Sequence, residues 1–393
     1  MKMQNVTTIE TIEPKGIVED NIVNPTYIMQ GRADKKALDI YHLILAPTYG
    51  CNLRCKHCYL SEHTPNTLPR DIVLRLVEEW NEIVLEERGE YGGIFHIKGG
   101  EPFVVPYLWD ILDRVAEIRT LRLMLTTNGT FVDEKIFKKL SGYKDALDGH
   151  LTVIVSLDGA TGETDAKIRG DGHYAKALRF LQGLRKCDIN FYLNCVLHKG
   201  NIDELSAYIR LAKEYGASQV NFLNFIPRGN GSNLRDWQLP HLDLYETLEE
   251  LYKSGDGQTK IMLAGSLPEI KYQETCKSCP TSGECVAAYR GLLYITPDGY
   301  VFTCPNTTYP DTCLGNILNQ SLREIMENVK ELYGRLKAKS GAYICTGEKM
   351  LYEREEDIPC LKSLHGLQDS PDKIGLTYKT NPLSMSYCFN RNW

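Results

Sequence analysis

The chain has 393 residues, which exceeds one typical domain, so we expect one large domain and a smaller one. Its 45 Lys and Arg residues against 51 Asp and Glu residues give a net charge of -6, which disfavours nucleic acid and anionic membranes as partners. No apolar run is long enough to span a bilayer, and residues 1–24 lack the pattern of a signal peptide. We therefore expect a cytoplasmic protein.

Cysteine is abundant, with 13 residues in the chain. The cytoplasm is reducing, so metal ligation explains this number better than disulfides do. We expect Cys187 and Cys195 to be small buried hydrophobic residues, and the other eleven to be candidate metal ligands.

Residues 1–40 form an N-terminal extension that is too short for an independent domain. From Tyr41 to residue 255, β-type runs alternate with amphipathic segments. The clearest predicted helix carries an apolar stripe of Ile72, Leu76, Trp80 and Ile83. Predicted strands precede Cys51 and cover 93–97, 121–125, 151–156, 190–197 and 219–226. Six such alternations predict an α/β fold, a partial (β/α)6 TIM-like barrel, with a doubly wound sheet as the structural rival.

The first predicted strand leads into Cys51-Asn52-Leu53-Arg54-Cys55-Lys56-His57-Cys58-Tyr59. A structural zinc site takes four ligands, whereas three thiolates on a cubane iron–sulfur cluster leave one iron open. A zinc knuckle completed by His57 or by a distant cysteine remains the alternative. In a barrel, reactive groups lie in loops at the carboxyl ends of the strands, which is where these cysteines fall.

The spacing C-x3-C-x2-C followed by Tyr59 resembles the signature of the radical S-adenosylmethionine (radical SAM) enzymes. The resemblance implies a 4Fe-4S cluster on Cys51, Cys55 and Cys58, whose open iron site chelates SAM. It also implies cofactor-binding roles for the aromatic residue after the cysteines and for residues at later strand ends. These candidates are Tyr59, Gly99, Gly100, Glu101, Asn128, Ser156, Asp158, Arg169 and Asn194. Strand alternation directs Asn194 inward and Cys195 toward the helices.

Residues 256–393 are predicted to form a small cysteine-rich α+β domain. Two β-type runs, 292–296 and 300–303, flank Pro297-Asp298-Gly299, a strong hairpin signal that returns Cys304 toward the upstream cysteines. The spacing from Cys285 to Cys304 resembles the opening of the SPASM domain, which implies one auxiliary 4Fe-4S cluster. The later SPASM pattern is missing, so a second auxiliary cluster stays open. The remaining candidate metal ligands are Cys276, Cys279, Cys285, Cys304, Cys313, Cys345, Cys360 and Cys388.

The catalytic residue is unknown, with Cys313, Cys345 and Cys388 as candidates for quenching a radical or for cluster ligation; the alternative for isolated cysteines is zinc or free thiols. The resemblance implies reductive cleavage of SAM to a 5'-deoxyadenosyl radical that abstracts a hydrogen atom. It favours a maturase that installs a crosslink, an epimerisation or an oxidation in a ribosomally made precursor peptide, with a flavodoxin- or ferredoxin-type reductant. The alternatives are a radical SAM dehydrogenase or isomerase of a sugar or cyclitol, and a non-catalytic iron–sulfur or zinc redox scaffold.

Overall fold

One ten-stranded sheet organises the part of the chain that the computed structural model describes, residues 42–239, 259–264, 292–306 and 308–337. The strand order is β10-β9-β8-β1-β2-β3-β4-β5-β6-β7. The strands are β1 His42–Leu45, β2 Ile94–Ile97, β3 Arg122–Thr127, β4 Leu151–Ser156, β5 Phe191–Leu197, β6 Gln219–Asn224, β7 Lys260–Ala264, β8 Leu292–Ile295, β9 Tyr300–Phe302 and β10 Gly315–Asn316.

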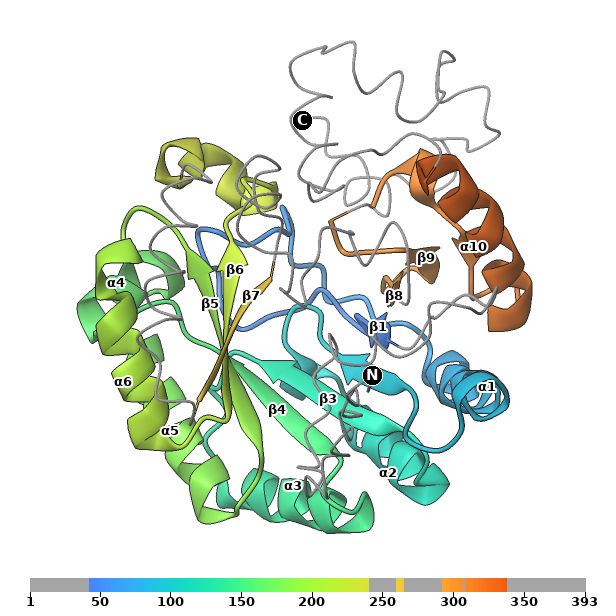
Figure 1. Ribbon diagram of the computed structural model, residues 1–393, viewed down its shortest axis with the longest axis horizontal. Coiled ribbons are helices and arrows are strands. Elements are labelled where there is room, and N and C mark those ends of the chain that lie inside the picture. Colours follow the sequence, from blue (N-terminus) through green and yellow to red (C-terminus); the bar gives the residue numbers. More distant parts are fainter. Residues whose placement is uncertain (1–41, 240–258, 265–291, 307, 338–393) are drawn as a thin grey trace, which may run out of the picture.

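Parallel pairing runs from β8 through β1 to β7, and the sheet curls with helices on its outer side (Figure 1). The α-helices are α1 Arg70–Arg88, α2 Leu108–Ile118, α3 Glu134–Ala146, α4 Gly162–Arg169, α5 His173–Lys186, α6 Leu205–Tyr215 and α10 Leu322–Lys337. Short 3-10 helices are η2 Pro102–Val104, η3 Ile202–Glu204, η4 Gly229–Trp237 and η5 Pro310–Thr312. The expected α/β barrel-like fold is confirmed.

Strand alternation divides the core into an outer and an inner part. Phe95 and Ile97 of β2 face the helices in the main core, whereas Ile94 packs inside the barrel with Met124, Ile154 and Tyr192. Fully burying a Leu or Val side chain stabilises the fold by about 1.5–3 kcal/mol, and many such residues line the outer core. The inner face, by contrast, carries polar side chains toward the carboxyl ends of the strands, where the cysteine loop begins.

The C-terminal segment shares this sheet. β8 pairs in parallel with β1, opposite His42 through Leu45, and β9 returns antiparallel after a turn in which Gly299 has φ 82°. The predicted hairpin is therefore confirmed, but its first strand extends the barrel sheet. β7 likewise lies beyond residue 255 and still belongs to the sheet. The domain division at residues 255 and 256 stays a prediction.

Helix α10 anchors this segment on α1 (Figure 1). The Leu322 amide donates to Glu79 Oε2 over 2.5 Å, and Arg323 pairs with Glu86 at 2.8 Å. Ile325 is fully buried in the same core as the barrel helices. None of the described helices combines the length and apolar character needed to cross a membrane.

The structure adds one short helix, α4, that the sequence did not predict, and its last residue is Arg169. The Thr161 side chain accepts from the Thr164 amide and so caps its first turn. The helix expected near residues 244–251 lies outside the described residues.

Candidate active site

The cysteine loop leaves the carboxyl end of β1 and crosses the top of the sheet before α1. Cys55 is buried, and Cys51 and Cys58 are partly buried. The Leu53 amide lies 3.4 Å from Cys51 Sγ, and Asn128 Nδ2 lies 3.8 Å from the same sulfur. Donors directed at sulfur stabilise the thiolate form that binds metal.

Burial acts against the thiolates when no metal is bound. It raises the pKa of the Cys55 thiol to about 11 and the pKa of the Cys58 thiol to about 12, although the Arg169 guanidinium opposes both shifts. A bound metal deprotonates its thiol ligands outright. These buried thiols, with donors already in place, fit a metal centre better than free thiol chemistry.

A single-ion site has no support in the described part of the chain, where no three His, Cys, Asp or Glu side chains are placed to hold one ion. A cubane cluster has a different requirement, because each thiolate binds a separate iron and the sulfurs stand further apart than the ligands of one zinc. His57, the proposed fourth zinc ligand, directs Nε2 to Asp158 Oδ2 at 2.8 Å. The missing single-ion group among the described residues and the contact of His57 with Asp158 therefore favour a cluster on the three cysteines over a zinc knuckle.

Asp158 is the buried anchor of the loop. Its side chain is 0% exposed, and Oδ2 lies 2.7 Å from Arg169 Nε as well as 2.8 Å from His57 Nε2. Its Oδ1 accepts from the Val196 amide at 2.8 Å. Burial alone would raise the pKa of Asp158, but Arg169 and His57 hold it well below its usual range.

Arg169 extends this anchor to the predicted cluster ligands. Its Nη1 lies 3.9 Å from Cys55 Sγ, and the Ile168 carbonyl accepts from the Lys56 amide at 2.9 Å. Asp158 and Arg169 were predicted to bind the cofactor. The structure directs the Asp158 carboxylate to Arg169, His57 and the β5 backbone, and these contacts position the cysteine loop. The cofactor contacts of Asp158 and Arg169 stay predictions.

The Glu101 carboxylate also accepts hydrogen bonds from within the protein. Its side chain is fully buried, Oε1 accepts from Thr127 Oγ1 at 2.8 Å, and Oε2 accepts from the Asn128 amide at 2.8 Å. Burial raises the pKa of Glu101 to about 7, against the lowering effect of these donors. The predicted contact of Glu101 with SAM stays a prediction, and the observed carboxylate joins the end of β2 to the end of β3.

Gly99 and Gly100 let β2 approach the start of the cysteine loop. The Gly100 amide donates to Thr48 O, and the Glu101 amide donates to Gly50 O, each over 2.9 Å. A Cβ atom at Gly100 would lie 2.1 Å from Gly50 O, and Gly99 has φ 131°. The glycines are thus required for loop packing, and their predicted contact with the cofactor stays a prediction.

Asn128 fixes the other side of the loop. Its Nδ2 donates to Asn52 Oδ1 at 2.8 Å, and Asn52 in turn donates to Thr130. His173 holds the Asn128 carbonyl, with Nε2 at 2.8 Å from the oxygen, while its Nδ1 lies 2.6 Å from Asp165. The candidates from β3 and α4 therefore surround the same loop.

A polar row crosses the inner face of the last strands. Ser156, Asn194 and Asn221 are neighbours in register on β4, β5 and β6, and Asn221 Nδ2 donates to Asn194 Oδ1 at 2.8 Å. The predicted inward direction of Asn194 is confirmed, as is the burial of Cys195 at 1% exposure in the outer core. Cys187 is only partly buried. Sequence reasoning missed Asn221. It lies on the same strand face as Gln219, and two polar residues on one face of a barrel strand indicate the inner face.

Three further residues missed from the sequence surround Tyr59. Its hydroxyl lies 3.4 Å from that of Tyr294 on β8, which lies 3.3 Å from that of Tyr49. Lys98 Nζ lies 5.2 Å from the Tyr59 ring centroid. Lys98 precedes the glycine pair and shares the strand face of Ile94, which was a usable signal. Tyr294 gave none, because the pairing of β8 with β1 is a long-range contact.

The segment after β9 approaches the barrel through Arg228. This buried side chain, at the start of η4 after β6, donates to Pro305 O at 3.2 Å and to Thr308 Oγ1 at 3.0 Å. Pro305 directly follows Cys304, which is partly buried. Cys313 is also partly buried, and burial raises its thiol pKa to about 11. The other candidate ligands lie outside the described residues: Cys276, Cys279, Cys285, Cys345, Cys360 and Cys388.

The fold and the three-cysteine loop define an iron–sulfur protein of the barrel class. The radical SAM superfamily model matches residues 45–212, and the model of SPASM, an iron-sulfur cluster-binding domain, matches residues 285–347. The chain therefore contains a radical SAM domain followed by a SPASM domain. Its cofactors are a 4Fe-4S cluster, SAM and auxiliary iron–sulfur clusters. The number and the ligands of the auxiliary clusters stay predictions.

Curated relatives differ in what they make. The chain is 29% identical over 304 residues to an AdoMet-dependent heme synthase of Methanosarcina barkeri, covering 74% of this chain and 82% of the relative. It is 26% identical over 306 residues to the mycofactocin maturase MftC of Mycolicibacterium smegmatis, covering 76% of this chain and 72% of the relative. Streptococcus suis SuiB bound to precursor peptide SuiA shares the fold with a TM-score of 0.59 and 16% identity, covering 75% of this chain and 66% of SuiB.

Proposed function

We propose that this radical SAM enzyme modifies a ribosomally made precursor peptide, installing a crosslink, an epimerisation or an oxidation. The observation that carries the proposal is the joining of the SPASM hairpin to the radical SAM sheet, with β8 beside β1 and Arg228 reaching the backbone next to Cys304. The loop that binds SAM and the auxiliary-cluster segment thereby flank one barrel end. The similarity to MftC and the fold shared with peptide-bound SuiB support a peptide substrate.

The chemistry belongs to the cofactor, since the cluster with SAM supplies a 5'-deoxyadenosyl radical after one-electron reduction. The chain positions the cluster loop through Asp158, Arg169 and Asn128. The buried side chains that pack with Ile94 fill part of the barrel interior. We propose a flavodoxin- or ferredoxin-type protein as the source of the electron.

A small-molecule substrate is the second candidate, and the similarity to the heme synthase is the observation that favours it. A radical SAM dehydrogenase or isomerase would use the same cluster loop and SAM site. The two candidates differ in the molecule that loses the hydrogen atom.

Deuterium transfer separates the two. The anaerobically reconstituted protein is incubated with SAM, dithionite and deuterated peptides encoded by short reading frames beside its gene, and 5'-deoxyadenosine is analysed by mass spectrometry. We expect deuterium in 5'-deoxyadenosine and a mass change in one peptide. Deuterium that comes from a sugar or a tetrapyrrole, and from none of the peptides, would contradict the peptide proposal.

A further inference from the structure

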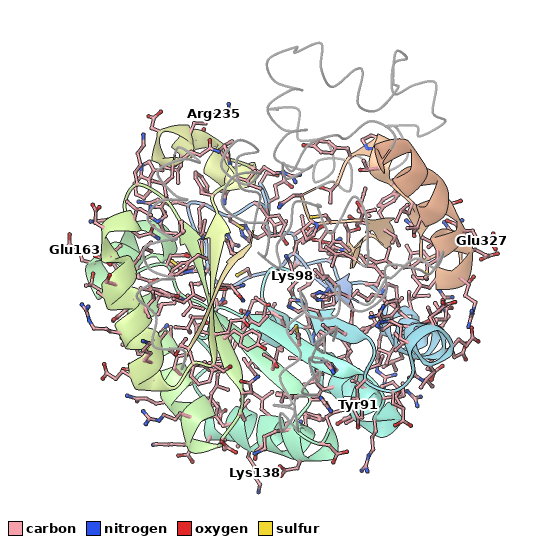
Figure 2. The ribbon with its side chains drawn as sticks, viewed as in Figure 1. Tyr91, Lys98, Lys138, Glu163, Arg235 and Glu327 are labelled. Atoms are coloured by element: carbon pink, nitrogen blue, oxygen red, sulfur yellow. The ribbon has the colours of Figure 1, made fainter. Side chains whose placement is uncertain are left out.

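Lys98 occupies the inner face of the barrel directly after β2. Phe95 and Ile97 face the outer core and Ile94 faces the inner one, so alternation places Lys98 on the side of Ile94. Its amide donates to Leu45 O over 2.9 Å, which continues the pairing of β1 with β2 past Ile97. Figure 2 shows Lys98 near the middle of the molecule, away from the peripheral Lys138 on α3.

The ammonium lies over two aromatic rings that belong to the two cysteine segments. Its Nζ is 5.2 Å from the ring centroid of Tyr59, which follows Cys58, and 5.7 Å from that of Tyr294 on the SPASM hairpin. Aromatic faces attract a cation and also limit its access to water. Lys98 therefore lies between the cluster loop and the auxiliary segment.

No carboxylate pairs with this ammonium within the described ranges. Neighbouring polar groups of the inner face do have partners: His42 Nε2 lies 3.0 Å from His96 Nδ1, His96 Nε2 lies 2.7 Å from Thr126 Oγ1, and Asn194 accepts from Asn221. A partly buried lysine without an acidic partner can be paired by an anion that arrives with the substrate.

We propose that Lys98 binds a carboxylate of the substrate and thereby places the substrate between the cluster loop and the SPASM hairpin. A lysine offers one compact positive charge, which suits a single carboxylate. This inference rests on the proposed function and deepens it, because it selects substrates with an acidic group close to the modified atom. The carboxylate belongs either to an Asp or Glu side chain or to the C-terminus of the peptide.

Two pairs of small probes distinguish these sources. N-acetyl-glutamate methylamide is compared with N-acetyl-glutamine methylamide, and N-acetyl-alanine with N-acetyl-alaninamide. Dissociation constants are measured by ligand-observed NMR on the reconstituted full chain with SAM. We expect one acid to bind about tenfold or more tightly than its amide, as for a charge-assisted hydrogen bond. The Lys98→Met substitution should bring that ratio to about one, and Lys98→Arg should restore most of it.

Lys138→Met is the matched control, since it removes an exposed ammonium from α3, and its acid-to-amide ratio should equal that of the native chain. A native ratio near one for both pairs would overturn the proposal, as would a ratio that Lys98→Met leaves unchanged. SAM cleavage is measured in the same native samples. If SAM is cleaved but neither acid binds more tightly than its amide, only the role of Lys98 is contradicted. If an acid binds more tightly than its amide but SAM is not cleaved, the proposed function is contradicted and the carboxylate site is kept.

Discussion

Replacing Asp158 with Asn should lower the free energy of unfolding by about 3–5 kcal/mol. The substitution leaves the Arg169 guanidinium, 8% exposed, without its buried counter-charge, and it also removes the ion pair with His57. Because both partners hold the cysteine loop, we expect the reconstituted variant to bind less iron than the native chain.

Urea unfolding at pH 7 measures the effect on stability, with Glu163→Gln as the matched control. Glu163 lies on α4, its side chain is 86% exposed, and its loss should change stability by about 0.5 kcal/mol or less. The pKa of Asp158 is lowered in the folded chain, so its contribution is present above the unfolded pKa of about 4 and is lost as the pH falls below it. Two results would contradict this role. One is a difference in unfolding free energy between the native chain and Asp158→Asn that stays constant from pH 7 to pH 3; the other is an equal loss of stability in Glu163→Gln.

The Gly100→Ala substitution should destabilise the fold by about 2–3 kcal/mol and weaken SAM binding. Its new Cβ would lie 2.1 Å from Gly50 O and 2.5 Å from Tyr49 O, and both are backbone atoms of the cysteine loop. The loop must therefore move away from β2. Urea unfolding and equilibrium dialysis with labelled SAM measure the two effects.

The control for this variant is Gly142→Ala. Gly142 is exposed on α3, and a Cβ atom added there would meet no atom within 4 Å outside its chain neighbours and the backbone of its own helix. Alanine inside a helix is favoured over glycine by about 0.5–1 kcal/mol, so this variant should be slightly stabilised. Native stability and native SAM affinity in Gly100→Ala would show that the close approach of β2 to the loop is not required.

Local patterns predicted most of the fold. The apolar stripe around Trp80 and the alternation around Asn194 each report a local environment, and the structure confirms both. The sequence did not reveal that β8 pairs with β1, because that contact joins residues about 250 positions apart and depends on the closed arrangement of the whole sheet. α4 was missed because its eight residues carry only a weak apolar pattern.

The same distinction applies to the site. Cys51, Cys55 and Cys58 and the glycine pair are readable because their spacing carries the chemistry. The partners of Asp158 and Glu101 were not readable, since a carboxylate at a strand end looks the same in sequence whether it binds a ligand or a buried arginine. In the structure, Asp158 pairs with Arg169 and Glu101 accepts from the Asn128 amide, and both of these partners contact the cysteine loop. Lys98 was overlooked because lysine is an ordinary surface residue until its strand face is considered.

SAM cleavage by a variant in which Cys51, Cys55 and Cys58 are all replaced by Ala tests the central claim most directly. The native chain and a Cys187→Ala control, which changes a partly buried cysteine at the end of α5, are reconstituted anaerobically in parallel. Dithionite-dependent formation of 5'-deoxyadenosine is measured together with iron per chain. We predict formation in the native chain and the control and none in the triple variant, which should keep only the iron of auxiliary clusters. Cleavage at the native rate in the triple variant would contradict the assignment of the loop as the SAM-binding cluster site.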